Sequence, residues 1–237
     1  MQIASQLSSV AAAAALASIS SAGVVYNSMA PSQGANGILV VSDPDETNSR
    51  TELPGLPTAR EWDAQAGDSI TLAGTDRFVT QFAVRLAAYT PTNMPASADV
   101  ELNIYTSVGG LPGTLLWTGT RTGFVFANSN NGVDALFTPN ITVPSSLVFS
   151  VAFSNIVNPG LRTMGLACYQ TTFVGTSATN IVVQDTASQA WRSEIYGTPF
   201  QNAQAQITAV PAPASLTVLA ISAAALRRRR TSAHAPR

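Results

Sequence analysis

The sequence predicts an all-β protein: a single antiparallel β-sandwich or jelly-roll domain, flanked by an N-terminal signal peptide and a short C-terminal apolar helix. Three observations lead to this prediction. Short stretches alternate apolar and polar residues with a period of two, which is the pattern of a half-buried strand. Turns rich in Gly, Pro and Asn separate these stretches, and no part of the body combines sustained helical periodicity with caps. Many short strands at regular spacing are typical of a sandwich.

Residues 1–22 are expected to be a secretory signal peptide. Residues 10–16 form an unbroken run of seven apolar residues, and small residues follow it up to Ser20, Ser21 and Ala22. An apolar run before a small-x-small site is typical of a signal that is cleaved on export. The alternative is a surface-exposed Ala-rich helix, for which so long an apolar run is unfavourable.

Residues 23–66 are expected to be an irregular N-terminal segment with one edge strand around residues 38–41. Four prolines break up any long element in this segment because proline lacks the amide donor that helices and sheets need. They are Pro31, Pro44, Pro54 and Pro57.

The sandwich itself is expected over residues 67–209. In one predicted strand, residues 81–89, the alternation places Phe82, Val84 and Leu86 on the face toward the core. The polar residues on the opposite face of this strand are Gln81 and Arg85.

A second predicted strand, residues 99–105, alternates in the same way. Its inward residues are Val100, Leu102 and Ile104, and its outward residues are Asp99, Glu101 and Asn103. Residues 147–153 repeat the pattern. Further strands are expected at residues 69–73, 115–122, 165–168, 181–184, 189–196 and 205–209.

Residues 210–237 have the layout of a sorting signal. A proline motif comes first, formed by Val210, Pro211, Ala212 and Pro213. An apolar segment then extends to residue 226, and as a helix from residue 214 its 13 residues would be about 20 Å long. A basic cluster follows at once, formed by Arg227, Arg228, Arg229 and Arg230. Four arginines beside an apolar segment favour a short membrane helix with a cytoplasmic tail over a buried C-terminal helix.

This arrangement closely resembles the PEP-CTERM sorting signal of bacteria that carry an exosortase. Val210, Pro211 and Pro213 match the Val-Pro-Glu-Pro-like motif, with Ala212 at the glutamate position. The resemblance implies that an integral-membrane cysteine protease, the exosortase, recognises and cleaves the tail. It implies a transient membrane anchor and a final place at the cell surface or in the extracellular matrix.

The body also resembles β-sandwich modules that are common in surface proteins with such tails. The resemblance rests on residues 67–80 and 109–117 and extends over about residues 67–155. It concerns the fold and contains no catalytic motif, so it implies no activity.

The charge distribution argues against a nucleic-acid partner. Only 11% of residues are charged, all 12 basic residues are arginine, and lysine is absent. Without the basic cluster and Arg237, seven arginines face all 13 acidic residues, which gives the preceding part of the chain a net charge of −6. A chain with this balance lacks the basic surface that binds phosphates.

Most catalytic chemistry is excluded by missing side chains. The only histidine is His234, beyond the basic cluster, and the only cysteine is Cys168, in an apolar stretch. A Ser-His-Asp or Cys-His site has no base here, and structural zinc lacks its ligands. A carboxylate-based glycosidase using Glu101, Glu61 or Asp63 is a remote alternative. We therefore expect no enzyme and no cofactor.

Two binding sites are alternatives to a purely structural role. Asp43, Asp45 and Glu46 supply oxygen ligands for Ca²⁺, although a solvated acidic turn explains them equally, since the spacing of an EF-hand loop is missing. The aromatic residues with the best positions for stacking on sugar rings are Trp62, Tyr89, Tyr105 and Trp117. Packing of each under a loop or across strands is the alternative.

The sequence thus predicts an exported, exosortase-sorted surface or matrix protein with a structural or adhesive role. The alternative function is a carbohydrate-binding module, with or without Ca²⁺, whose partner would be an extracellular polysaccharide.

Overall fold

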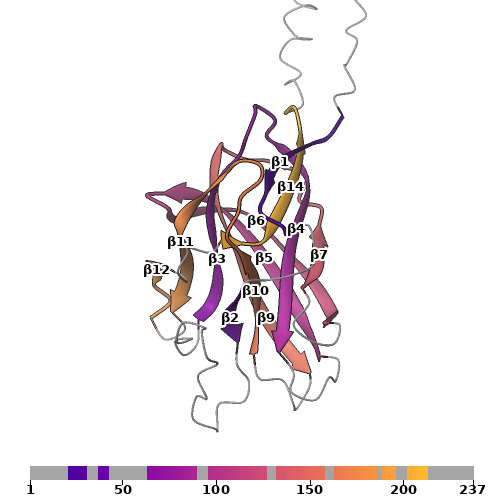
Figure 1. The fold of residues 1–237 in the computed structure, drawn as a ribbon, viewed down its shortest axis with the longest axis vertical. Helices are drawn as coiled ribbons and strands as arrows, with labels where there is room; N and C mark the ends of the chain where they lie inside the picture. The colour runs from indigo at the N-terminus through magenta and orange to yellow at the C-terminus, as the bar shows by residue number, and fades with distance from the viewer. Residues whose placement is uncertain are drawn as a thin grey trace, which may run out of the picture.

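The computed structural model describes residues 21–30, 37–42, 63–89, 96–126, 132–157, 163–185, 188–195 and 202–212. These residues form 14 strands in two antiparallel sheets, which pack face to face as a β-sandwich (Figure 1). The predicted all-β sandwich is therefore confirmed.

Sheet A has eight strands and is built around β4. Its strands are β1 (Gly23–Asn27), β2 (Gly37–Ser42), β4 (Phe78–Tyr89), β7 (Val133–Phe137), β8 (Ile141–Thr142), β10 (Thr163–Tyr169), β13 (Asn202–Ala203) and β14 (Ala205–Val210). Strands β14 and β10 pair with successive parts of β4, and β8 and β7 also pair with it.

Sheet B has six strands in the order β12-β11-β3-β9-β5-β6. Their bounds are β3 (Asp63–Thr71), β5 (Ala96–Val108), β6 (Leu111–Phe126), β9 (Ser146–Val157), β11 (Thr176–Asp185) and β12 (Trp191–Glu194). A two-residue turn, Gly109 and Gly110, joins β5 to β6, and both glycines have positive φ (61° and 84°). Glycine is required there because tight hairpin turns of this kind need left-handed backbone at both positions.

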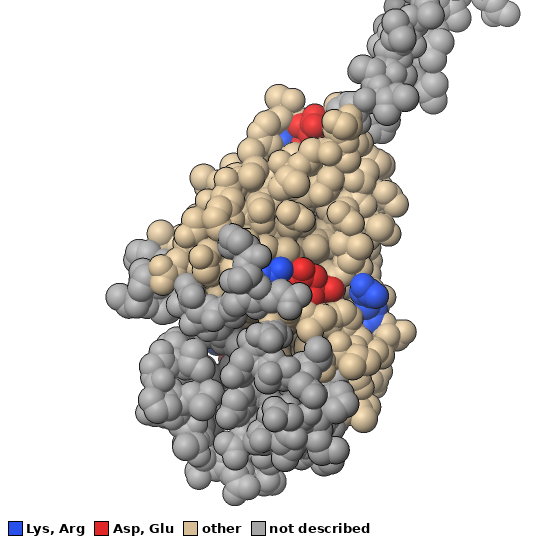
Figure 2. All heavy atoms as spheres, turned by 45° about the vertical axis from the view of Figure 1, so that its right-hand side comes forward, with Lys and Arg blue, Asp and Glu red and all other residues tan. Residues whose placement is uncertain are grey.

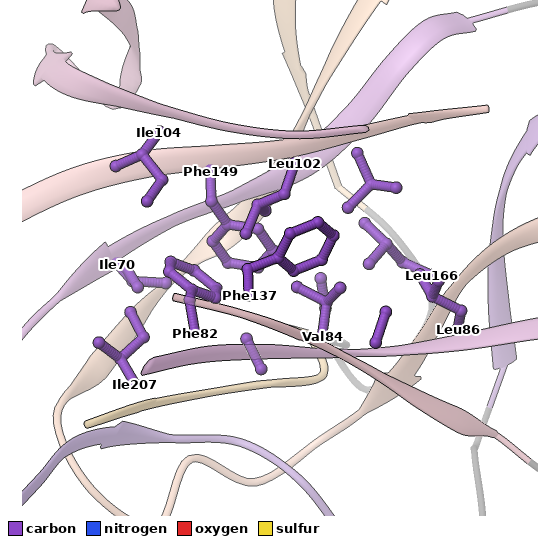
Figure 3. Close-up of a cluster of buried hydrophobic side chains, with 14 of the residues drawn as sticks. Ile70, Phe82, Val84, Leu86, Leu102, Ile104, Phe137, Phe149, Leu166 and Ile207 are labelled. Carbon is purple, nitrogen blue, oxygen red and sulfur yellow. The ribbon is translucent and has the colours of Figure 1, made fainter. Parts of the chain in front are cut away.

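The core lies between the sheets, where the two sets of inward side chains meet (Figure 3). The residues predicted to face inward from β4 and β5 are fully buried, and they are Phe82, Val84, Leu86, Val100, Leu102 and Ile104. Phe82 of sheet A and Phe149 of sheet B make an edge-to-face contact with their ring centroids 5.3 Å apart. Contacts of this kind add to the burial energy that holds the two layers together.

The two ends of the described body lie side by side in sheet A. Gly23 at the start of β1 pairs with Ala209 of β14, and both strands lie at one end of the sandwich (Figure 1). Strand β2 covers the residues where an edge strand is expected, and among the described strands it pairs with β10 alone. Residues 23–66 thus contribute β1, β2 and the first residues of β3 to the sheets.

Much of the two terminal signals lies outside the described residues. Residues 1–20 and 213–237 are not described, and they include Pro213, the apolar segment and the basic cluster. Of the proline motif, Val210 ends β14, and Pro211 and Ala212 follow it, both exposed. The described residues contain no helix long and apolar enough to cross a membrane.

Candidate functional site

The outer face of sheet B is concave and carries a group of polar and aromatic side chains. We refer to these residues as the outer-face cluster: Gln65, Glu101, Asn103, Tyr105, Ser150 and Trp191. The ring centroids of Tyr105 on β5 and Trp191 on β12 are 5.7 Å apart, although three strands, β11, β3 and β9, lie between β12 and β5 in the sheet. In a flat sheet, four strand spacings would separate them by about 19 Å. The sheet therefore curls, and this also brings β12 close to β6.

Gly67 on β3 explains part of this curvature. A Cβ atom at this position would overlap the carbonyl group of Phe149 and lie 2.7 Å from the Cα of Ser150, both on the neighbouring strand β9. Only a residue without a side chain lets the two backbones approach so closely. The β12-β11-β3 side of the sheet can then bend over the β9-β5-β6 side.

The hydrogen bonds of the outer-face cluster converge on one atom. Gln65 Oε1 accepts from Ser150 Oγ (2.6 Å), Asn103 Nδ2 (3.1 Å) and Tyr105 OH (3.4 Å). Asn103 Nδ2 also donates to Glu101 Oε1 (2.8 Å). Burial raises the pKa of the Tyr105 phenol, and the nearby Glu101 carboxylate adds to this.

The outward position of Asn103 is as predicted, but it does not bring this residue to solvent. Asn103 points away from the core as expected, but it is only 3% exposed. The reason is the curvature of sheet B, which encloses its own outer face and also buries Ser150 and Val148 there. Strand parity predicts which face a residue occupies but not whether that face reaches water.

The predicted sugar-contact residues are not brought together. Tyr105 belongs to the outer-face cluster, whereas Trp117 packs against the core and makes an edge-to-face contact with Phe137 at 6.2 Å. Trp62 lies outside the described residues, and of Tyr89 only the backbone, at the end of β4, is described. The sequence alone does not single out Trp191 as the partner of Tyr105, because their contact depends on the curl of the sheet.

The chain matches no known protein-family model, no curated protein and no solved structure.

A second polar site lies in sheet A, at a split where β14 and β10 separate after pairing with successive parts of β4. Where β4 changes partner from β14 to β10, the fully buried Gln204 lies between β13 and β14. The backbone N–H of Gln204 donates to the backbone carbonyl of Ala167 (2.8 Å), and the backbone carbonyl of Gln204 accepts from the backbone N–H of Arg85 (3.0 Å). Its side-chain Oε1 accepts from the Ala30 amide (2.9 Å), and Nε2 donates to the Cys168 carbonyl (3.3 Å). Gln204 thus supplies the bonds that the split would otherwise leave unmade.

Arg85 completes this junction, on the face of β4 opposite the core residues, as predicted. The side chain is on the expected face but the residue is only 6% exposed. Its Nε and Nη2 donate to the two carboxylate oxygens of Asp134 (2.7 and 3.0 Å), and Nη1 donates to the Ala30 carbonyl (3.0 Å) and Gln204 Oε1 (3.2 Å). The chain near Ala30, Gln204 and Gly132 covers the guanidinium, which no strand pattern reveals.

A third polar group lies inside the sandwich itself. Asp68 on β3 is fully buried, and its Oδ2 accepts from Ser177 Oγ (2.8 Å) and the Ala203 amide (3.2 Å). Its Oδ1 and the hydroxyl of the buried Tyr26 make no hydrogen bond. Burial raises the pKa of Asp68 to about 8, so the carboxyl is largely protonated at neutral pH.

The remaining predicted ligand and acid positions fall outside what the structure describes. Asp43, Asp45, Glu46 and Glu61 lie outside the described residues, and of Asp63 only the backbone is described. Within the described parts of the chain, no three His, Cys, Asp or Glu side chains lie close enough together to hold a metal ion.

Proposed function

We propose that this protein is exported, sorted by its C-terminal signal to the cell surface or extracellular matrix, and serves there as a structural or adhesive module without catalysis. The observation that carries the proposal is the join between fold and signal. The sandwich ends at Val210, and the next motif residues, Pro211 and Ala212, are exposed. A membrane protease can therefore reach Pro211 and Ala212 without unfolding the body.

The N-terminal end supports the same proposal. Strand β1 begins at Gly23, directly after the predicted signal peptide of residues 1–22, and pairs with β14. Cleavage after Ala22 and after Pro211 would leave every described strand in place. The described surface is also sparing in charge, with charged side chains confined to small groups in the view of Figure 2. Such a surface offers little for binding a highly charged polymer such as nucleic acid.

Substitution within the basic cluster tests the sorting step. When Arg227, Arg228, Arg229 and Arg230 are all changed to Gln, we expect the chain to lose its membrane stop and its retention at the surface. The measurement is the distribution of the protein among membrane, surface and medium fractions of the source cells. An Arg237→Gln control, which removes one arginine outside the basic cluster, should distribute as the wild type. Unchanged surface retention of the quadruple variant would overturn the proposal.

A second candidate function is glycan binding at the outer-face cluster. Its specific support is the Tyr105 and Trp191 pair beside the amide of Gln65 and the carboxylate of Glu101. Aromatic rings that stack on sugars, next to planar polar groups that bind hydroxyls, are a suitable combination for this ligand class.

A polysaccharide array tests this second function. Trp191→Ala should abolish any binding. Phe173→Ala should leave binding unchanged, because Phe173 is 47% exposed but lies outside the outer-face cluster. Binding that is equal for the two variants would reject the outer-face cluster as the site. Repeating the wild-type assay with a chelator decides whether Ca²⁺ takes part.

A further inference from the structure

The outermost strand of sheet B, β6, has an unpaired edge. At 16 residues it is the longest strand described, and among the described strands it pairs only with β5. Most of its residues are exposed or half-buried. The other edge of this sheet, β12, has only four residues and carries Arg192 and Glu194. An exposed strand edge presents a row of backbone donors and acceptors that can pair with another strand.

The middle of β6 lacks most features that prevent such pairing. Natural sheet edges are protected by charges, prolines and bulges. Within β6 the only charged residue is Arg121 and the only proline is Pro112, close to the start. Residues 117–121 pair with β5 in uninterrupted register, and the irregularities of this pair lie on either side of them. A regular, nearly uncharged stretch therefore lies in the centre of the free edge.

We propose that β6 pairs antiparallel with β6 of a second copy of this chain, centred on Gly119, to join two copies of sheet B into one continuous sheet. This inference rests on the proposed structural role, because self-pairing would give a surface or matrix module its cohesion. In this register Thr118 faces Thr120 of the other copy. Arg121 lies opposite Trp117, so the two arginines are kept apart. Self-pairing thus meets no like-charge conflict, which is the usual obstacle to an isologous edge.

Exposed apolar side chains flank the paired segment and favour the same occupant. Leu115 is 49% and Val125 is 58% exposed on β6, and Leu136 on the adjacent β7 is 42% exposed. A second copy would cover part of this apolar surface on both chains, which adds hydrophobic burial to the backbone hydrogen bonds. A polar or charged peptide would leave this gain unused.

Charge substitution at the edge tests the proposal on the full chain in a mild non-ionic detergent, by sedimentation velocity over a range of concentrations. The Thr118→Lys, Thr120→Lys double variant places like charges opposite each other and should raise the dimer dissociation constant at least about tenfold. The Thr118→Glu, Thr120→Glu variant should do the same. An equimolar mixture of the two should recover dimers. Thr176→Lys, Thr179→Lys on the interior strand β11 is the matched control and should behave as the wild type.

Cysteine pairing gives a second test that needs no added charge. A Thr118→Cys, Thr120→Cys variant should form cross-linked dimers under mild oxidation, and Thr176→Cys, Thr179→Cys should not. The native Cys168 is buried. A monomeric wild type, or lysine and cysteine variants that behave like their controls, would overturn the proposal. Neither result would affect export and sorting, which the fractionation experiment tests separately.

Discussion

At the scale of single residues, buried polar groups have the largest expected effect on stability. Asp68 sits in the core with one carboxyl oxygen lacking a hydrogen-bond partner, beside the unpartnered hydroxyl of Tyr26. Burying such groups is costly, and protonation of the carboxyl reduces that cost. The structure therefore predicts that stability depends on pH through this residue.

We expect the free energy of unfolding to fall as the pH rises through Asp68's titration range. The folded pKa is raised from the ordinary 3.8 to about 8, so the folded state holds its proton more tightly than the unfolded state. The resulting stabilisation is fully present below about pH 4 and is lost progressively up to about pH 8. Asp68→Asn should flatten this dependence and exceed the wild type in stability above pH 8. Urea unfolding at pH 5, 7 and 9 measures this pH dependence of the free energy of unfolding. A wild type that is more stable at pH 9 than at pH 5 would contradict the raised pKa of Asp68.

Arg85 is expected to be far more important for stability than an exposed arginine. Arg85→Leu would leave the Ala30 carbonyl and Gln204 Oε1 without their guanidinium donor and Asp134 without its ion-pair partner. Breaking a buried ion pair costs about 3–5 kcal/mol, although the half-exposed Asp134 lowers the expected cost to about 2–4 kcal/mol. Arg121→Leu removes only an exposed hydrogen bond to the Leu136 carbonyl and a cation–π contact with Phe124, and should cost about 1 kcal/mol or less. Equal midpoints of urea unfolding for the two variants would show that the contacts of Arg85 do not contribute to the stability of the fold.

At the scale of elements, the sequence pattern predicts strand faces well and strand environments poorly. The alternation in β4 and β5 places six buried side chains correctly, and the Gly-Gly turn marks the hairpin between β5 and β6. The environments of Arg85 and Asn103 are missed because segments distant in sequence cover them. The length of β6 is also underestimated, because the strand continues on both sides of the predicted residues 115–122, from Leu111 and as far as Phe126.

The curvature of sheet B is predicted to depend on Gly67. Gly67→Ala would force β3 and β9 apart, because the added Cβ meets the backbone of Phe149 and Ser150 and not a flexible side chain. We expect a loss of about 2 kcal/mol or more and an increased exposure of Trp191, seen as a red shift in tryptophan fluorescence that Trp191→Phe removes. Gly23→Ala, where a Cβ meets nothing within 4 Å, is the control. A Gly67→Ala protein with wild-type stability and spectrum would refute this role.

At the scale of the whole molecule, the sandwich is a body with both of its ends at one place. Strands β1 and β14 pair beside each other, so the two predicted sorting segments leave the fold from the same end. The free edge of β6 belongs to the other sheet and is then available for pairing between copies. The part of this account that the sequence predicts is the fold class. The outer-face cluster and the junction in sheet A depend on tertiary packing, which residue patterns do not encode locally.

The most direct test of the central claim is the intact mass of the native protein, with C-terminal peptide mapping, from surface and membrane fractions of the source cells. The account predicts a chain that begins near Gly23, ends between Pro211 and Ser215, and lacks the basic cluster. A soluble chain that ends at Arg237 would contradict sorting by this signal, and a full-length chain held in the membrane would contradict its cleavage.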